Sequence, residues 1–546
     1  MSKVVFKSYD QGQTELFPSR LDGRIGVNSP VRLINSIVDK LEIGSLLESY
    51  CGGGTSAYHP RMLLKVVFYA YMNNVYSCRR IEDCLNQNIH YMWLSGSQYP
   101  SFSTINRFRS EHLKDRINSL FTQVVLMLVQ MGQITLETQY VDGTKIESVS
   151  NKYTFVWKKS IEKNKANLES KIASVLSQIE EGIAQDSQSA EDETPVPLDS
   201  AALKSRIEAL NEENQKKEKV DHSCGKLLKE LAKKQEKLEE YEQHLKLLAD
   251  RNSYSKTDPD ATFMRMKEDA MNNGQTKPGY NVQLGTEHQY ITNFGFYQTP
   301  ADTTTLPSFL DLHKSRFGSL PKELCADAGY GSEQNYERME EVHVEAFVKY
   351  NYFHKEQKKS VKNNLFLQEN LSYMEQENYF VCPSGQKMKF IASKETISNN
   401  GYVSQVDLYQ ASHCQGCPLR SQCHKSEMDR IIQINHKLRH YKRKARERLT
   451  SRQGLKHRSL RPVEPEAVFG QIKFNKQYKR FRHRGLDKIN MDFGVLVMAF
   501  NIKKLYNRYW KQNTEANVGN KDSQIGRICF FFFHTLRRVN YLHTCA

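Results

Sequence analysis

Three acidic residues lie in sequence contexts that are suited to catalysis on a phosphodiester bond. Asp142 ends an alternating stretch in "TLETQYVDGTKIES", and Asp327 ends a short apolar run in "KELCADAGYGS". Glu466 lies in "RPVEPEAVFGQIKFNK", within a strongly basic part of the chain. Carboxylates at strand ends in a mixed sheet converge at one edge, and a carboxylate from a later helix can complete a site for Mg²⁺, which prefers oxygen ligands. The combination therefore predicts metal-assisted phosphodiester chemistry.

Two Mg²⁺ ions roughly 3.5–4 Å apart in such a site would activate a nucleophile and stabilise the leaving 3′ oxygen. Each acid alone is more typical of a strand end or turn, so the prediction depends on all three. Asp302, in "TPADTTTL", is a further acid close to these segments. Its position favours the N-cap of the next helix over a metal ligand.

Helix geometry distinguishes the two glutamates of "EPE". Pro465 suits the first position of a helix, which places Glu464 at the boundary and Glu466 in the first turn. On that helix Glu466, Gly470 and Lys473 share one face, which offers a carboxylate, an open space for DNA and a cation for phosphate. Glu464 is expected to be a capping or solvent residue.

Positive charge is concentrated around Glu466. The net charge is +16, and the segment from Lys437 to Arg461 has eleven Lys or Arg in 25 residues with one acid. The segment from Lys473 to Arg484 has six in twelve, interleaved with aromatic residues that can stack on unpaired bases. A solvated helix face normally mixes both signs of charge. The expected DNA-binding residues here are Arg461, Lys473, Lys476, Lys479, Arg480 and Arg482.

Four cysteines lie close together in the segment before this basic region. Cys414 and Cys417 form a C-x-x-C pair, with Cys382 before it and Cys423 after it. Four thiolates would make a closed structural zinc site without catalytic function. Reduced thiols in a β-rich insertion, or a decayed site, are the alternatives.

The first 125 residues or so are expected to be helical. Apolar residues in "SPVRLINSIVDKL" fall on one helical face, and "STINRFR" begins a further helix. The arginines of these short helices, Arg107 and Arg109 among them, favour a helix-turn-helix-like DNA reader over an ordinary helical domain with solvated arginines.

The remaining pattern predicts a mixed α/β sheet. A strand that ends at Asp142 is expected within 135–148, and a pair of strands within 277–299, followed by helix, strand, helix and strand to about residue 351. Between the first strands, apolar residues at coiled-coil spacing in 161–183 and 227–248 predict an antiparallel helical hairpin with a disordered tip. A parallel oligomerisation coil is the alternative. The final helix, within 490–510, is expected to be apolar on one side.

Composition limits the class of protein. The N-terminus has no signal peptide pattern, and no stretch approaches the roughly 20 apolar residues that span a bilayer. The 11 cysteines are unevenly spread, which is typical of reduced thiols. A soluble, cytoplasmic protein without membrane contact is therefore expected.

The blocks "YVDGTKIE", "CADAGYGS" and "EPEAVFGQIKFNKQYKRFRHRG" resemble the three catalytic blocks of bacterial insertion-sequence DDE transposases. The closest pattern is the group with Tyr-x2-Arg-x3-Glu-x6-Lys in the third block. Lys473 matches its lysine, but Ser459 and Pro462 stand where it has tyrosine and arginine, so Arg461 or Arg458 is the candidate replacement. The resemblance also includes "HPRMLLKVVFYAY" and "GYNVQ", and so covers most of residues 15–510.

The resemblance implies an RNase H-like core in which Asp142, Asp327 and Glu466 hold two Mg²⁺ ions, with Mn²⁺ as a substitute. It also implies terminal repeats and target DNA as partners, a homodimer on DNA, and association with the nucleoid. The expected organisation is a helical DNA-binding or dimerisation domain at 1–130, core segments at 131–154, 257–351 and 451–512, a helical insertion at 155–256, a Cys-containing insertion with a basic segment at 352–450, and a poorly structured tail at 513–546.

The leading hypothesis is a transposase that hydrolyses the element's ends and joins the freed 3′-OH to target DNA. An RNase H-like nuclease without strand transfer is a second enzyme hypothesis. A DNA-binding protein without catalytic activity belongs to a different class, and in it the carboxylates would be structural. Strand-transfer products separate the first two, and the effect of Asp142→Ala on cleavage and on DNA binding tests the third.

Overall fold

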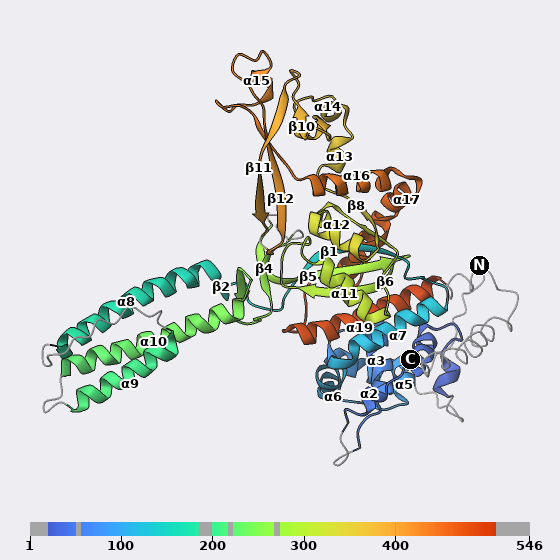
Figure 1. Cartoon of the computed structure of the whole chain (residues 1–546). Coiled ribbons are helices and arrows are strands. Elements are labelled where there is room, and N and C mark those ends of the chain that lie inside the picture. The colour runs from blue at the N-terminus through green and yellow to red at the C-terminus, as the bar shows by residue number, and fades with distance from the viewer. Residues whose placement is uncertain are drawn as a thin grey trace, which may run out of the picture. The chain divides into compact units, whose positions relative to one another are not determined.

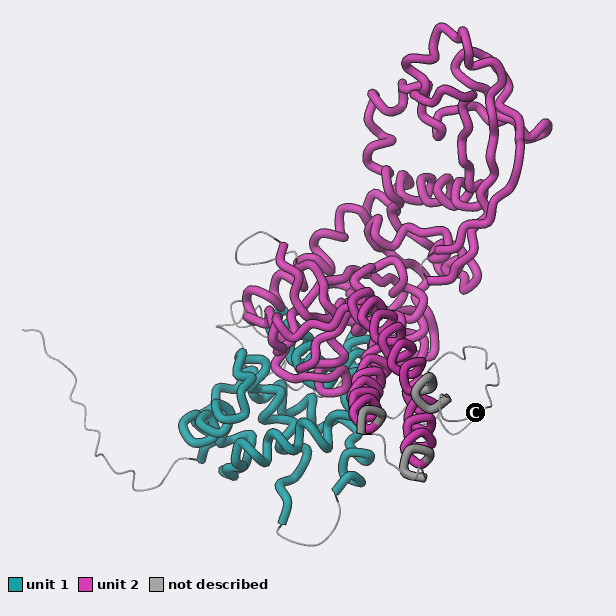
Figure 2. Tube along the Cα trace, turned by 90° about the vertical axis from the view of Figure 1, so that its left-hand side faces the viewer, with its two compact units in different colours: residues 1–134, 490–546 teal, residues 135–489 magenta. Residues whose placement is uncertain are grey.

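The computed structural model describes residues 20–50, 56–184, 199–216, 222–266, 274–398 and 400–508. The chain divides into two compact units, residues 1–134 with 490–546 and residues 135–489 (Figure 2). The expected disordered tip of the helical insertion falls largely outside the described residues, as does the tail from 513.

The first unit is helical. Its predicted helix over residues 29–41 is α1, which begins with Pro30 at a favourable first position and buries Val31, Ile34 and Val38 completely. The helices of this unit are η1 (Leu21–Arg24), α1 (Pro30–Asp39), α2 (Gly44–Leu47), α3 (Pro60–Met72), α4 (Cys78–Gln87), α5 (Ile89–Ser95), α6 (Phe102–Arg107), η2 (Phe108–Leu113), η3 (Lys114–Arg116), α7 (Ile117–Gln130) and, from Asn490 onward, α19 (Leu486–Tyr506).

Helix α19 differs from its prediction. Every residue from Met491 to Ile502 is buried, the polar Asp492 and Asn501 included, so the helix has no solvated side there. A substituent at Gly494 would lie 2.4 Å from Ile117 of α7, which shows how closely the two helices approach. The one-sided pattern expected from the sequence is therefore wrong, because packing covers the helix on all sides.

The second unit contains a mixed six-stranded sheet (Figure 1). Its path is β4-β5-β1-β7-β8, with β6 paired to β5. β1 is antiparallel to β5 and parallel to β7, and β7 is parallel to β8. The predicted mixed α/β sheet is confirmed. Its elements are β1 (Thr138–Glu147), β4 (Thr262–Arg265), β5 (Thr276–Glu287), β6 (Tyr290–Tyr297), α11 (Leu306–Phe317), β7 (Glu323–Ala326), η4 (Ala328–Tyr330), α12 (Glu333–Glu341) and β8 (Glu345–Val348).

A helical insertion follows β1. The short strands β2 (Phe155–Trp157) and β3 (Ser253–Ser255) pair antiparallel where the insertion begins and ends. The described residues between them form three helices side by side, where the sequence predicted a hairpin of two (Figure 1). The additional helix contributes Leu203, Ile207 and Leu210 to the shared apolar core. These helices are α8 (Lys158–Ala184), α9 (Ser200–Lys216) and α10 (His222–Leu248).

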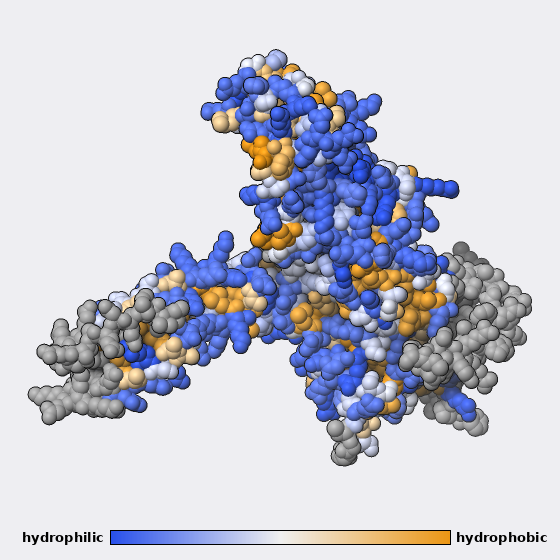
Figure 3. All heavy atoms as spheres, viewed as in Figure 1, coloured by the Kyte–Doolittle hydropathy of each residue, from blue (hydrophilic) through white to orange (hydrophobic). Residues whose placement is uncertain are grey.

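A second insertion follows β8. It contains a five-stranded sheet in the order β13-β12-β11-β10-β9, with apolar surface along β11 and β12 (Figure 3). Helix α16 then returns to the main sheet, where Tyr441 and Ala445 join its core. The elements are α13 (Phe353–Glu356), α14 (Lys359–Lys362), η5 (Gln368–Asn370), β9 (Ser372–Met374), β10 (Tyr379–Val381), β11 (Lys387–Ile397), β12 (Val403–Gln410), α15 (Arg420–Cys423), β13 (Ile431–Ile434) and α16 (His436–Thr450).

The segment that carries Glu466 is a long interrupted helix. It begins at α17 (Arg452–Leu460), capped by the Ser451 hydroxyl, and continues through η6 (Pro462–Glu466), α18 (Ala467–Gly470) and η7 (Gln471–Asn475). η6 and η7 are π-helical, and in η6 two prolines lack the N–H that a regular α-helix needs. Pro465 is therefore inside the helix, and the prediction that it starts one is wrong.

Candidate active site

Strand register brings the two aspartates together. Thr138, Gln139 and Tyr140 of β1 pair with Glu323, Leu324 and Cys325 of β7, and the same offset carried forward aligns Asp142 with Asp327. β7 ends at Ala326, so the edge of β1 beside Asp142 has no strand partner there. Asp142 lies in the middle of β1, which runs on to Glu147, so the prediction that it ends a strand is wrong. The predicted convergence with Asp327 is nevertheless present.

Arg461 lies between the three candidate carboxylates. Its Nη2 is 3.4 Å from Asp142 Oδ1 and 3.5 Å from Asp327 Oδ2, and its Nη1 donates to Glu466 Oε1 at 2.7 Å. The Arg461 side chain is 8% exposed, so the guanidinium is shielded from water, whereas the side chains of Asp327 and Glu466 are about half exposed. The structure thus brings together three acids from distant parts of the sequence around one cation.

The interrupted helix is held against the sheet next to this network. His457 Nδ1 lies 2.9 Å from the Tyr140 hydroxyl, and its Nε2 lies 3.1 Å from the Glu323 carboxylate. Lys473 donates from Nζ to Thr144 Oγ1 at 2.6 Å, two residues beyond Asp142 on the same strand. Contacts at both ends therefore fix Glu466 with respect to β1.

Burial raises the pKa of Asp142 to about 6. The Arg461 charge opposes this shift, while the neighbouring charge of Asp327 adds to it. Because the folded protein holds this proton more tightly than the unfolded chain, Asp142 lowers stability as the pH rises from about 4 to 6.

A comparison with Asp142→Asn in metal-free buffer tests this shift. The free energy of unfolding of the unchanged chain, relative to the variant, is expected to fall by up to about 3 kcal/mol between pH 4 and pH 6. Urea titrations at several pH values would measure the difference. A difference that does not change with pH would show that the Asp142 carboxyl titrates at its ordinary value.

Glu464 has a different role from Glu466. Its side chain is buried and accepts a hydrogen bond at 2.6 Å from the backbone N–H of Gln289, in the turn between β5 and β6. The prediction that it is a capping or solvent residue is therefore wrong. Glu466 is 48% exposed on its side chain, and a substituent on Gly470, one helical turn later, would meet no atom of the described structure.

This difference predicts opposite effects for the two glutamates. Glu464→Ala is expected to lower stability by about 1–3 kcal/mol because it removes this acceptor from the partly buried Gln289 N–H, while the folded fraction keeps its DNA cleavage. Glu466→Ala is expected to lose cleavage with little change in stability. Urea unfolding and a cleavage assay normalised to folded protein measure both. Equal loss of cleavage in the two variants would contradict the assignment.

The eight predicted DNA-binding residues divide by exposure. Lys479, Arg480, Arg482 and Arg107 are exposed, and Arg480 also donates to the carbonyls of Ser148 and Ser150. The other four, Arg461, Lys473, Lys476 and Arg109, are buried.

Arg109 is a clear correction to the sequence prediction. It is 2% exposed and forms an ion pair with Asp492, while Nη1 donates to the Tyr76 carbonyl at 3.1 Å. Its guanidinium also donates to the Tyr71 hydroxyl. Arg109 therefore holds the helical unit together and is not available to DNA in this structure.

Two other features of the basic region also differ from expectation. Tyr478 and Phe481 are buried, which leaves Phe474 as the exposed aromatic residue of that segment. Several cations of α16 pair with acids of α12 and α13, although their own segment contains almost no acid. These pairs are Lys437–Glu337, Lys444–Glu340 and Arg446–Glu356.

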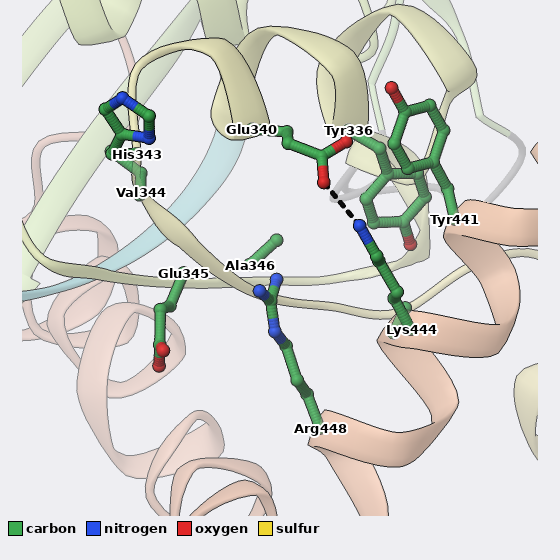
Figure 4. A pocket seen from close by; sticks show the side chains of 10 residues that line it. Tyr336, Glu340, His343, Val344, Glu345, Ala346, Tyr441, Lys444 and Arg448 are labelled. Atoms are coloured by element: carbon green, nitrogen blue, oxygen red, sulfur yellow. Dashed lines mark hydrogen bonds and ion pairs between the residues drawn. The ribbon is translucent and has the colours of Figure 1, made fainter.

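A cavity of about 300 Å³ lies between α12, β8 and α16, and Figure 4 shows the Glu340–Lys444 pair at its wall. None of the three candidate carboxylates lines it. Its walls instead combine Tyr336, Tyr441 and Arg448 with this ion pair. The cavity is therefore separate from the carboxylate site.

The four cysteines of the predicted zinc site line one small pocket together with His424. Arg430 lies among them, donating from Nη1 to Cys423 Sγ at 3.1 Å and from its backbone N–H to Cys414 Sγ at 3.4 Å. Among the described residues no group of three or more His, Cys, Asp or Glu is arranged to hold a metal ion. At both predicted metal sites an arginine lies among the donor atoms.

The donor atoms of the carboxylate site are nevertheless of the type that binds a divalent cation. Its donors are hard oxygens, and the guanidinium of Arg461 already places positive charge among them. The prediction that Asp302 is an N-cap is wrong, because its side chain lies beside Gly143 and accepts hydrogen bonds from Asn281 and Gln283, while Thr305 caps the helix. The alternation of Asn281 and Gln283 along β5 was the available signal, because it places two amides on one face.

Comparison with known protein families gives two matches. Residues 19–111 match a transposase domain (DUF772), and residues 381–506, which include Glu466 and Lys473, match a transposase DDE domain. No curated protein and no solved structure matches the chain. Within its described parts, none of the helices is long and apolar enough to cross a membrane. These two matches to separate parts of the chain, with the acids of the three blocks gathered around Arg461, support an insertion-sequence DDE transposase.

Proposed function

We propose that the protein cleaves the ends of an insertion sequence and joins the freed 3′-OH to target DNA. The observation that carries this proposal is the convergence of Asp142, Asp327 and Glu466 on the Arg461 guanidinium. The test is an assay with a pre-cleaved element end and a labelled target duplex. Strand-transfer products that depend on Asp142 support the proposal, and cleavage without joining favours the nuclease alternative.

Asp142, Asp327 and Glu466 would hold two Mg²⁺ ions, for which Mn²⁺ is expected to substitute. When bound, the ions would activate water and stabilise the leaving 3′ oxygen. Arg461 would have to leave the carboxylates, and its guanidinium would then be available to a phosphate oxygen. Lys473 lies beside Thr144 and offers a second cation on the same face of β1.

The core would be RNase H-like. In support, the path β6-β5-β1-β7-β8 has antiparallel pairs among its first three strands and parallel pairs among its last three. The six residues between Glu466 and Lys473 agree with the Tyr-x2-Arg-x3-Glu-x6-Lys group. Arg461 would replace the arginine of that pattern, one position earlier in the chain.

The partners would be terminal inverted repeats and target DNA. Lys479, Arg480, Arg482 and Arg107 are the predicted contacts that remain exposed. A transposase that pairs two element ends is expected to be a homodimer on DNA, in the cytoplasm and associated with the nucleoid. The domain boundaries predicted from the sequence, with the helical N-terminal domain at 1–130 and the core resumed at 257 and 451, stay part of this proposal.

A catalytically inactive DNA-binding protein is the alternative from another class. It predicts that Asp142→Ala changes neither DNA binding nor the background level of cleavage. The transposase proposal predicts retained DNA binding with loss of Mg²⁺-dependent cleavage in the same variant. Normal cleavage by this variant would contradict the proposed site.

The cysteine pocket would hold structural zinc once Arg430 moves from its sulfur atoms. Supporting this, Cys382 meets Cys414, Cys417 and Cys423 from another part of the insertion, and both ring nitrogens of His424 are buried without a hydrogen-bond partner in the described structure. Purified protein is expected to carry about one zinc ion per chain.

Replacing both Cys414 and Cys417 with serine is expected to remove this zinc, because two of its four thiolates are lost. Elemental analysis of the purified protein measures the content, and Cys84→Ser in the helical unit serves as the control. Unchanged zinc in the double variant would contradict the site.

A further inference from the structure

Asp302 lies against the residues that follow both catalytic aspartates. A substituent on Gly143, next to Asp142, would lie 2.5 Å from Asp302 Oδ1. A substituent on Gly329, two residues after Asp327, would lie 3.0 Å from Asp327 Oδ1 and 3.9 Å from Asp302 Oδ2. Asp302 is thus the fourth acid at one small site.

The two oxygens of Asp302 have different surroundings. Oδ1 accepts hydrogen bonds at 2.8 Å from the side-chain amides of Asn281 and Gln283, while Oδ2 accepts none from the described residues. Gln283 in turn accepts a hydrogen bond from the buried Tyr330 hydroxyl. This network fixes the orientation of the carboxylate and leaves one oxygen for a further ligand.

Helix capping does not account for the Asp302 side chain. The N-cap of α11 is Thr305, and Asp302 serves this turn through its backbone carbonyl, which accepts from the Thr305 N–H and hydroxyl. The side chain instead points to the amides of β5. Its negative charge is not needed to accept two neutral hydrogen bonds.

We propose that Asp302 is a fourth carboxylate of the metal site and shares a divalent cation with Asp142 and Asp327. This inference rests on the proposed function, because it uses the same site. Two divalent cations carry four positive charges. With Asp302 the site has four carboxylates, whose negative charges would balance them. The amides of Asn281 and Gln283 would hold Oδ1 while Oδ2 faces the cation, as supporting hydrogen bonds do around metal ligands.

Asp302→Asn separates the metal role from the structural one, because it keeps an oxygen for the two amides and removes the charge. The probe is Fe²⁺ with ascorbate and peroxide, which cuts a protein chain beside the bound ion. The full chain is expected to give fragments that end near residues 142 and 327. Asp302→Asn is expected to weaken Fe²⁺ binding, read from the concentration for half-maximal cutting, by about tenfold.

Three variants make the outcomes distinct. Asp311→Asn, on the exposed surface of α11, is the matched control and is expected to cut like the unchanged chain. Asp142→Asn is expected to lose the cuts, and if it keeps them the proposed active site itself is wrong. If Asp142→Asn loses them and Asp302→Asn binds Fe²⁺ normally, only the role of Asp302 is overturned. Equal thermal unfolding midpoints show that Asp302→Asn is folded.

Discussion

Asp142→Asn is expected to slow cleavage of an element end by about a thousandfold or more. The substitution removes one negative oxygen from the centre of the site, where Arg461 also contacts Asp327 and Glu466. A metal ion contributes several kcal/mol to the transition state of such reactions, and about 1.4 kcal/mol corresponds to a factor of ten. Single-turnover cleavage of a labelled end in Mg²⁺ measures the rate.

The control for this variant is Glu137→Gln, which neutralises an exposed acid just before the same strand, where it pairs with Lys322. Its rate should stay within a factor of about two, as expected for a surface ion pair of little energy. Gel-shift titration should show that both variants still bind DNA. If Asp142→Asn cleaves at the control rate, the metal site lies elsewhere.

Arg109→Met is expected to lower the free energy of unfolding of the helical unit by about 3–5 kcal/mol. The reason is that Asp492, which lies almost completely buried beside Arg109, would lose its positive partner. Removing one member of a buried ion pair is much more costly than removing both. Urea unfolding, followed by a probe in the helical unit, measures the loss.

The double variant Arg109→Met with Asp492→Leu is the matched control, because it replaces the whole pair with apolar side chains. It should recover much of the lost stability. Arg107→Met, at an exposed position two residues earlier, should leave stability unchanged and weaken DNA binding. An Arg109→Met protein of normal stability with weakened DNA binding would restore the original interpretation of Arg109 as a DNA contact.

Local pattern was sufficient to predict the two strands that position Asp142 and Asp327. Alternation around Tyr140 and the apolar run before Asp327 both mark strands that the structure contains. The sequence could not show that β1 continues to Glu147. The edge beside Asp142 is open because the pairing of β1 with β7 stops before this residue, although β1 itself does not end there.

Burial and partners were harder to predict, since both depend on contacts between distant segments. Arg109 and Tyr478 have the residue types of a nucleic-acid surface, yet tertiary packing covers them. The cations of α16 have Glu447 as the one acid in their own helix, but Glu337 and Glu340 reach them from α12. Asp302 was misjudged for the same reason, because its partners Asn281 and Gln283 lie on another strand.

The parallel pairing of β1 with β7 has a consequence for how such proteins can diversify. Backbone hydrogen bonds between adjacent strands set the separation of Asp142 and Asp327, so the length of chain between them is irrelevant to it. The α8–α10 segment leaves and returns through the paired strands β2 and β3, which already bring its two ends together. Evolution or an engineer can therefore lengthen, shorten or exchange this module without moving either aspartate.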